Sequence, residues 1–248
     1  MMSVLTKVYR KIKEILGTSV KPYDFNKSNP LGDKGERVDI ELKGKIIFDK
    51  LDIYQKNHWK RYEFAETFIN DTDVIGDFAC GTGYGSILLA EKAKEVCGAD
   101  INAHVINKIK ERYTHIRNVN FIEADLLNLS YDKYFDTIVS FETVEHFKEA
   151  DIEKLLLVFK KALKPGGKII FSTPYMQEDS EAATKAGFHQ TYYIDEEKIS
   201  SWLKQAGFSI ESFNYQNYDT HIIEGILQKK EFIIGVANKN NQSLSFNI

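Results

Sequence analysis

The chain has 248 residues, and 43% of them are apolar, so it can bury a full hydrophobic core without metal or disulfide support. Its formal net charge of −3 argues against a general nucleic-acid-binding protein, because such proteins usually carry a clearly basic face. These properties predict one large domain, with or without an added arm, that does not bind nucleic acid.

The cysteines and the apolar runs indicate the cellular compartment of the protein. Cys80 and Cys97 lie in apolar stretches, and no Cys/His spacing typical of a metal site surrounds them. The first residues lack the continuous apolar stretch of a signal peptide. No run approaches the roughly 18 apolar residues that a membrane-spanning helix needs. The sequence therefore predicts a cytoplasmic protein with free thiols and no bound metal.

Residues 1–50 form the first predicted unit. Residues 4–16 place apolar side chains at helical spacing with basic side chains opposite, which predicts a basic amphipathic helix. This helix packs on its own domain or on the partner subunit of a homodimer; the alternative is attachment to an anionic membrane surface. From 17 to 50, Gly, Pro, Asn and Asp recur without periodicity, which indicates a loop-rich arm.

Residues 51–248 form the second predicted unit, in which apolar strand-like runs alternate with helix-like stretches. The runs are 74–79, 95–99, 119–122, 135–141, 167–173, 208–215 and 232–237. Alternation of this kind predicts an α/β fold, with a Rossmann-like, seven-stranded, mostly parallel sheet and helices on both faces.

The stretch "VIGDFACGTGYG", residues 74–85, begins as a buried strand and ends in a glycine-rich turn. Gly81 and Gly83 can adopt positive φ and lack Cβ, so the backbone can turn sharply and approach a ligand closely. Asp100 ends the next strand run, where an acid commonly bonds ribose hydroxyls. Asp77 would repel the pyrophosphate of a dinucleotide and attract an ammonium group. The pattern predicts an adenosine-type cofactor that carries such a group.

Five motifs, found in order along the chain, resemble those of the class I S-adenosylmethionine (SAM)-dependent methyltransferases, and the resemblance covers about residues 54–215. They are "DFACGTGYG", "GAD", "EADLLNL", "FDTIVSFETVEHF" and "LKPGGKIIFSTP". The resemblance implies that the cofactor is SAM. It places the SAM site at Tyr62, Asp77, Ala79, Gly81, Gly83, Asp100, Ile101, Asp125, Leu126 and Glu142. Ala79 stands where many members of the family have glycine.

Some of these acids also have a structural interpretation. Asp77 and Asp100 stand at strand ends, which they could simply cap. Asp125, which the resemblance assigns to the adenine edge, could instead be the N-cap of a helix before Leu126.

The segment "YQKNHWKRYEFA", residues 54–65, resembles an H-x-x-R-Y-E-F stretch of methyltransferases from glycan assembly. By this resemblance Arg61 pairs with the carboxylate of the cofactor, while Tyr62 and His58 close the pocket. The alternative is that the aromatic residues belong to the core and Arg61 is a surface cation.

Candidate catalytic residues lie in "FETVEHF" and in a later Phe-His pair. Attack by a hydroxyl on a sulfonium benefits from a base, and His146, His189 and Glu145 are of the right type. The E-x-x-E-H pattern recurs in several unrelated methyltransferases, so it also has an interpretation as a helix cap. For His189 the alternative is an exposed loop histidine.

The glycan-type segments favour an O-methyltransferase whose acceptor is a sugar hydroxyl, on a nucleotide-activated sugar for capsule or other surface polysaccharide. The E-x-x-E-H stretch also resembles quinone-pathway methyltransferases, so a lipid or quinone-type metabolite is the alternative acceptor. RNA is disfavoured by the charge. A SAM-binding subunit without catalytic activity is the alternative outside the enzymes.

Overall fold

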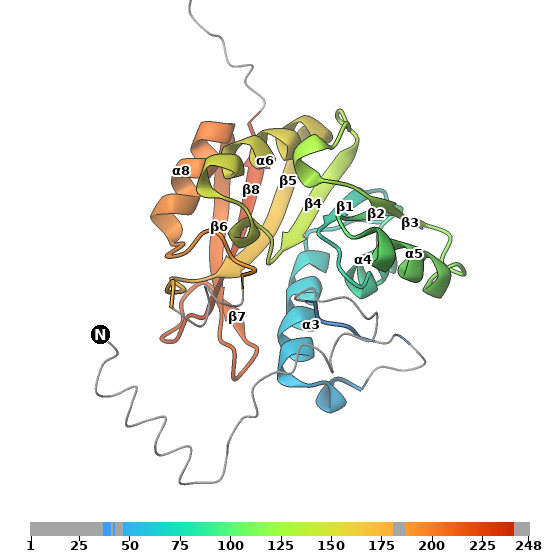
Figure 1. Cartoon of the computed structure of the whole chain (residues 1–248), viewed down its shortest axis with the longest axis horizontal. Coiled ribbons are helices and arrows are strands. Elements are labelled where there is room, and N and C mark those ends of the chain that lie inside the picture. Colours follow the sequence, from blue (N-terminus) through green and yellow to red (C-terminus); the bar gives the residue numbers. More distant parts are fainter. Residues whose placement is uncertain (1–36, 41, 43–46, 181–186, 241–248) are drawn as a thin grey trace, which may run out of the picture.

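A computed structural model describes residues 37–40, 42, 47–180 and 187–240 (Figure 1). The predicted amphipathic helix at 4–16 and most of the predicted arm lie outside these residues. No helix in the described part of the chain is long and apolar enough to cross a membrane.

The centre of the fold is one sheet with the strand order β3-β2-β1-β4-β5-β8-β6-β7 (Figure 1). The strands are β1 (Val74–Phe78), β2 (Glu95–Asp100), β3 (Val119–Glu123), β4 (Phe135–Phe141), β5 (Leu163–Pro174), β6 (Phe208–Gln216), β7 (Ile223–Glu224) and β8 (Phe232–Lys239). Strands β1 to β5 pair in parallel, and β8 is antiparallel to both β5 and β6. The predicted Rossmann-like α/β fold is confirmed.

Two details of the sheet differ from the predicted runs. The strand β7, only two residues long, pairs with the end of β6 and adds an eighth strand that is too short to give an alternating pattern. The strand β5 begins at Leu163, before the predicted run, and its pairing with β4 shifts register around the turn at Gly166, where φ is 76°.

Helices cover both faces of the sheet. They are α3 (Ile53–Glu66), α4 (Tyr84–Ala90), α5 (Ala103–Arg112), α6 (Glu149–Ala162) and α8 (Glu196–Ala206). Three short 3-10 helices join them, namely η1 (Phe48–Lys50), η2 (Leu126–Asn128) and η3 (Val144–His146). The apolar sides of α6 and α8 pack on one face, and those of α3, α4 and α5 pack on the other.

The helix α3 carries two of the predicted site residues, Arg61 and Tyr62, and a capping box fixes where it begins. The backbone N–H of Gln55 donates to the Asp52 carboxylate at 2.8 Å, and the Asp52 N–H donates to the Gln55 side chain at 2.9 Å. Both Arg61 and Tyr62 are buried against the sheet. The start of α3 therefore sets which side chains reach the end of β1.

The contact between α3 and α4 predicts a strong effect of Gly85→Ala on stability. A Cβ at Gly85 would lie 1.9 Å from Cζ of the buried Tyr62 ring, so one of the two helices has to move. We expect the free energy of unfolding to fall by about 1–3 kcal/mol, the usual range for overpacking. Urea unfolding measures this. In Gly225→Ala the new Cβ meets nothing closer than 3.9 Å, so that variant is the control. Equal stability of the two variants would contradict the packing.

The strand order reverses between β1 and β4. The neighbours β2 and β3 lie on one side of β1, whereas β4 and β5 lie on the other. In open sheets of this kind, ligands bind beyond the carboxyl ends of the strands at such a reversal. The predicted motifs that end β1, β2, β3 and β4 lie at this edge, whereas the segment 54–65 lies in α3.

Candidate functional site

A cavity of about 580 Å³ lies at the carboxyl ends of β1, β2 and β4. Eight of the residues that the sequence assigned to SAM line it: Tyr62, Ala79, Gly81, Asp100, Ile101, Asp125, Leu126 and Glu142. The structure thus brings together side chains from α3, from three strand ends and from η2. Three other assigned residues, Arg61, Asp77 and Gly83, do not line this cavity.

The turn after β1 holds its shape through unusual backbone angles. Ala79, Gly81 and Gly83 all have positive φ, at 61°, 53° and 76°. Ala79 therefore adopts the left-handed conformation that glycine accepts most easily. A Cβ at Gly83 would lie 2.9 Å from the Phe121 ring, so this glycine allows packing against β3 rather than approach to a ligand.

Asp100 connects this turn to the end of β2. Its carboxylate accepts hydrogen bonds from the backbone N–H of Gly81 at 3.1 Å and of Asn102 at 2.9 Å. It also pairs with the Arg37 guanidinium at 3.0 Å. The side chain is nearly buried yet lies in the cavity wall, which fits the predicted role as the ribose-binding acid.

The segment 37–40 covers the turn, which the sequence analysis did not foresee. Thr82 donates to the carbonyl of Val38 at 3.0 Å, and Arg112 pairs with Asp39 at 2.8 Å. Ile40 is buried in the core beside α3 and α4. This stretch of the predicted arm therefore packs on the domain. No local pattern in the sequence signals it, because an isolated Arg-Val-Asp-Ile has no periodicity.

Asp77 is buried and does not line the cavity. Ser86 donates to its carboxylate at 2.6 Å and the Tyr62 hydroxyl donates at 3.2 Å. Burial raises the pKa of Asp77 to about 7, and the two hydrogen bonds only partly oppose this rise. In this geometry Asp77 holds Tyr62, which does line the cavity. A direct contact with the SAM ammonium stays a prediction.

The raised pKa of Asp77 predicts a pH dependence of stability. The folded-state pKa of about 7 exceeds the unfolded value of about 4, so the folded chain holds this proton more tightly. The stabilisation is complete below pH about 4 and is lost as the pH rises through 7. Urea unfolding between pH 4 and 8 should show the wild type losing stability relative to Asp77→Asn as the pH rises. Parallel curves for the two proteins would contradict the raised pKa.

Asp125 serves the structural role that the sequence analysis left open, and it also lines the cavity. Its carboxylate accepts from the N–H of Leu127 at 3.0 Å at the start of η2. The neighbouring Leu126 is buried in the core beneath. Ile101, in contrast, is 69% exposed at the end of β2, so a flat ligand in the cavity could cover it.

A second cavity of about 410 Å³ adjoins the first. The two share Arg37, Val38, His58, Glu142 and His146. Polar and charged side chains contribute much of the remaining wall, together with several aromatic rings. They are Asn57, Arg61, Glu145, Gln177, His189, Lys230 and Glu231, with Tyr54, Tyr175, Tyr218 and Phe232.

Arg61 lies in this second cavity wall and is fully buried, so it is not a surface cation. Its Nε donates to Gln216 at 2.8 Å, its Nη1 lies 3.3 Å from Glu142, and its guanidinium stacks on the Phe232 ring. Nearby, burial lowers the pKa of His58 well below its ordinary value, and the positive charge of Arg61 lowers it further. Arg61 thus faces the second cavity, and its predicted pairing with the SAM carboxylate stays a prediction.

Glu142 stands where the two cavities meet. It has a positive φ of 49° at the end of β4, and its carboxylate accepts from the Ser172 hydroxyl at 2.6 Å. Strained backbone of this kind in a non-glycine residue is often found at functional sites. The backbone angle and the two partners, Ser172 and Arg61, fix the Glu142 carboxylate between the cavities.

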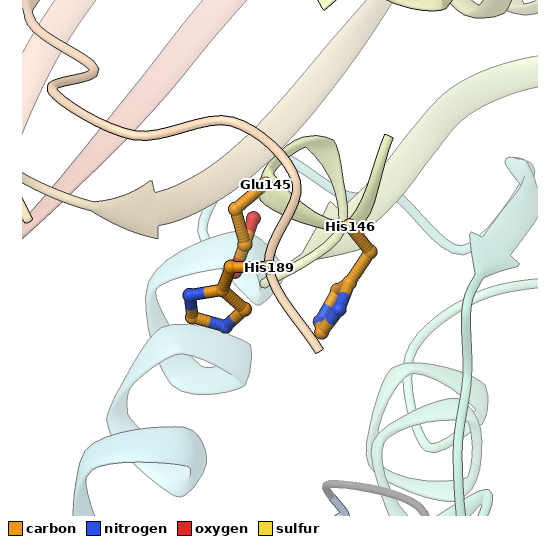
Figure 2. A group of neighbouring side chains, drawn as sticks. All are labelled: Glu145, His146 and His189. Atoms are coloured by element: carbon orange, nitrogen blue, oxygen red, sulfur yellow. The ribbon is translucent and has the colours of Figure 1, made fainter. Parts of the chain in front are cut away.

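Glu145, His146 and His189 lie together although they come from different segments. Figure 2 shows Glu145 and His146 on η3, with His189 on the loop that passes over them. The two imidazole rings meet edge to face with centroids 5.0 Å apart. Glu145 and His189 line the second cavity, and His146 lines both. All three predicted catalytic residues therefore line the second cavity.

Comparisons with known proteins agree with this geometry. Residues 75–167 match the family described as a methyltransferase domain. A probable S-adenosylmethionine-dependent methyltransferase of Mycolicibacterium smegmatis is 28% identical over 165 residues, which cover 63% of this chain and 62% of that protein. The match and this relative indicate a SAM-dependent methyltransferase. SAM is its cofactor, and most of the residues that the sequence assigned to SAM line the larger cavity.

Two further comparisons give the extent of the similarity in sequence and in fold to methyltransferases. Phosphoethanolamine N-methyltransferase 1 of Arabidopsis thaliana is 34% identical over 158 residues, covering 59% of this chain but only 31% of that protein. The N-methyltransferase NodS of Bradyrhizobium japonicum, solved with S-adenosyl-L-homocysteine (SAH), superposes with a TM-score of 0.59. It is 15% identical and covers 77% of this chain and 90% of NodS, which is a likeness of fold.

Proposed function

We propose that this methyltransferase domain transfers the methyl group of SAM to a hydroxyl of a sugar, on a nucleotide-activated sugar used for capsule or other surface polysaccharide. The observation that carries this proposal is the second cavity, which adjoins the SAM cavity and offers hydrogen-bonding side chains on several sides. A polyol needs many hydrogen-bond partners when it is buried. Aromatic rings in the same wall suit the apolar faces of a sugar ring.

The charges in the second cavity favour a sugar that bears a phosphate. Arg37, Arg61 and Lys230 line the wall, and Arg61 is the most deeply buried of the three. A guanidinium binds phosphate through charge-assisted hydrogen bonds. Each of the three already pairs with a carboxylate, of Asp100, Glu142 or Glu196, so a phosphate would compete with these partners. The argument against a lipid tail therefore rests on the many polar side chains in the wall.

The chemistry requires alignment and removal of one proton. The acceptor oxygen attacks the methyl carbon, the carbon–sulfur bond breaks, and its electron pair stays on sulfur to give SAH. The hydroxyl proton leaves to a base or to solvent. Positioning supplies much of the rate of such an in-line displacement. His146 and Glu142 lie in both walls, so they stand where acceptor and methyl group would meet.

Methyl transfer to an amine is the second candidate, because the Arabidopsis relative and NodS are both named N-methyltransferases. An amine acceptor must be neutral to attack. The carboxylates Glu142 and Glu145 beside the cavity would favour its protonated form. The hydroxyl acceptor therefore remains the primary proposal.

The experiment is a panel of acceptors with methyl-labelled SAM and purified protein. It includes nucleotide sugars, amino sugars, free sugars, a catechol-type quinone precursor and phosphoethanolamine. Product masses and fragmentation show which atom carries the label. Label on a sugar oxygen supports the proposal, whereas label only on nitrogen or on the catechol would reject it. SAM binding without turnover on any acceptor would favour a non-catalytic subunit.

A further inference from the structure

We propose that Glu145, His146 and His189 form a binding site for one divalent transition-metal ion at the boundary of the two cavities. Each side chain offers one ligand atom, and these atoms all lie within 4.8 Å of one another (Figure 2). The sequence predicted no metal, because the two histidines are far apart in the chain and show no ligand spacing. The fold brings them together.

The hydrogen bonds of the two histidines set their tautomers for metal binding. His146 Nδ1 lies 3.0 Å from the carbonyl of Phe188, which can only accept, so Nδ1 carries the proton. His189 Nδ1 lies 2.8 Å from the side-chain oxygen of Gln177, which assigns its proton in the same way. The lone pair of each ring then resides on Nε2. Metal-binding histidines almost always donate their other N–H to such an oxygen.

The loop that carries His189 is attached firmly to η3. The backbone N–H groups of Gln190 and Thr191 both donate to the carbonyl of Glu145, at 2.7 and 3.1 Å. The Gln190 side chain donates to the carbonyl of His146 at 2.8 Å, and the Thr191 hydroxyl donates to that of Phe147 at 2.7 Å. These bonds place the third ligand beside the other two before any ion arrives.

Burial and ligand type indicate which ions would bind. Glu145 is 1% exposed, and a buried carboxylate is stabilised by a nearby cation. Two imidazoles and one carboxylate suit zinc, iron(II), cobalt(II) and manganese(II), whereas magnesium prefers oxygen ligands. Ligands of one ion at about 2.0–2.2 Å lie somewhat closer together than 4.8 Å, so we expect the side chains to close slightly.

Three protein ligands leave coordination positions open, as in catalytic rather than structural sites. His146 lies in the wall of both cavities, so an open position would face the place where the acceptor meets the methyl group. A metal ion lowers the pKa of a bound hydroxyl and holds it in place. This use of the ion rests on the proposed function; the binding of the ion does not.

The test is a titration of the untagged, chelator-treated full chain with zinc or cobalt(II) chloride, followed by calorimetry and, for cobalt, by visible absorption. We expect one ion per chain. Glu145→Gln and His189→Ala should each weaken binding at least about 10-fold, and Gln177→Leu, which removes the hydrogen-bond partner of His189 Nδ1, by about 10- to 100-fold. His115→Ala, on the exposed surface, is the matched control and should bind like the wild type.

Several outcomes would overturn the site: no binding to the wild type, equal binding in every variant, or loss in His115→Ala as well. SAH binding and thermal unfolding of each variant show whether the fold is intact. Metal binding without sugar methylation would uphold the site and reject the proposed acceptor. If a protein that binds no metal still methylates the sugar in the presence of chelator, the proposed acceptor is upheld and the metal site is rejected.

Discussion

Replacing Asp100 by alanine is expected to lower SAM affinity by about two orders of magnitude. The carboxylate lies in the cavity wall at the end of β2, where a ribose hydroxyl pair can donate to it. Hydrogen bonds to charged groups contribute about 1.5–3 kcal/mol each, and about 2.7 kcal/mol corresponds to 100-fold. Calorimetry with SAM and with SAH measures the change directly.

Two further variants separate ribose binding from support of the turn. Asp100→Asn keeps the shape and can still accept from the Gly81 N–H, but it lacks the charge. We expect it to lose less affinity than Asp100→Ala, with some loss of thermal stability because its NH2 group cannot accept from Arg37 or from the Asn102 N–H. Asp71→Ala removes an exposed acid outside the cavity wall and is the control. Unchanged affinity in Asp100→Ala would remove this residue from the SAM site.

The sequence allowed the fold and much of the larger cavity to be predicted, because both depend on local patterns. Buried parallel strands are continuous apolar runs, and the runs at 74–79 and 135–141 coincide closely with β1 and β4. The acids and glycines that end such strands must meet at one edge, since parallel strands share it. Asp100 and Gly81 are an example, joined by a direct hydrogen bond.

The rest of the site depends on contacts between distant segments. Arg61 was assigned to SAM from its motif, but Gln216 and Phe232, which follow it much later in the chain, hold it in the second cavity wall. Arg37 reaches both cavities from a segment without periodicity. The pairing of His189 with His146 follows from the loop that bonds to η3. Residue types alone carry no signal for such contacts.

Replacing His189 by alanine is expected to lower kcat by about 10²- to 10⁴-fold, the range that a positioned base contributes, because its Nε2 either takes the hydroxyl proton or holds the proposed metal ion that lowers the pKa of the hydroxyl. A sugar hydroxyl has a pKa far above 7, so its attack on the sulfonium needs help with the proton. His189 lines only the second cavity, which makes it the cleaner test of the acceptor side. We therefore expect SAM affinity to stay close to that of the wild type. Steady-state kinetics with the identified acceptor, together with SAM calorimetry, measure both quantities.

His146→Ala should show a similar fall in kcat but also some loss of SAM affinity, because His146 lines both cavities. His115→Ala removes an exposed histidine and should change neither quantity. If His189→Ala lost SAM affinity in proportion to kcat, the residue would support the fold instead of the reaction. If neither cavity histidine affected turnover, removal of the proton would fall to Glu142 or Glu145, or alignment alone would suffice. The pH–rate profiles of Glu142→Gln and Glu145→Gln then separate these cases, because only removal of the carboxylate that takes the proton shifts the acidic limb.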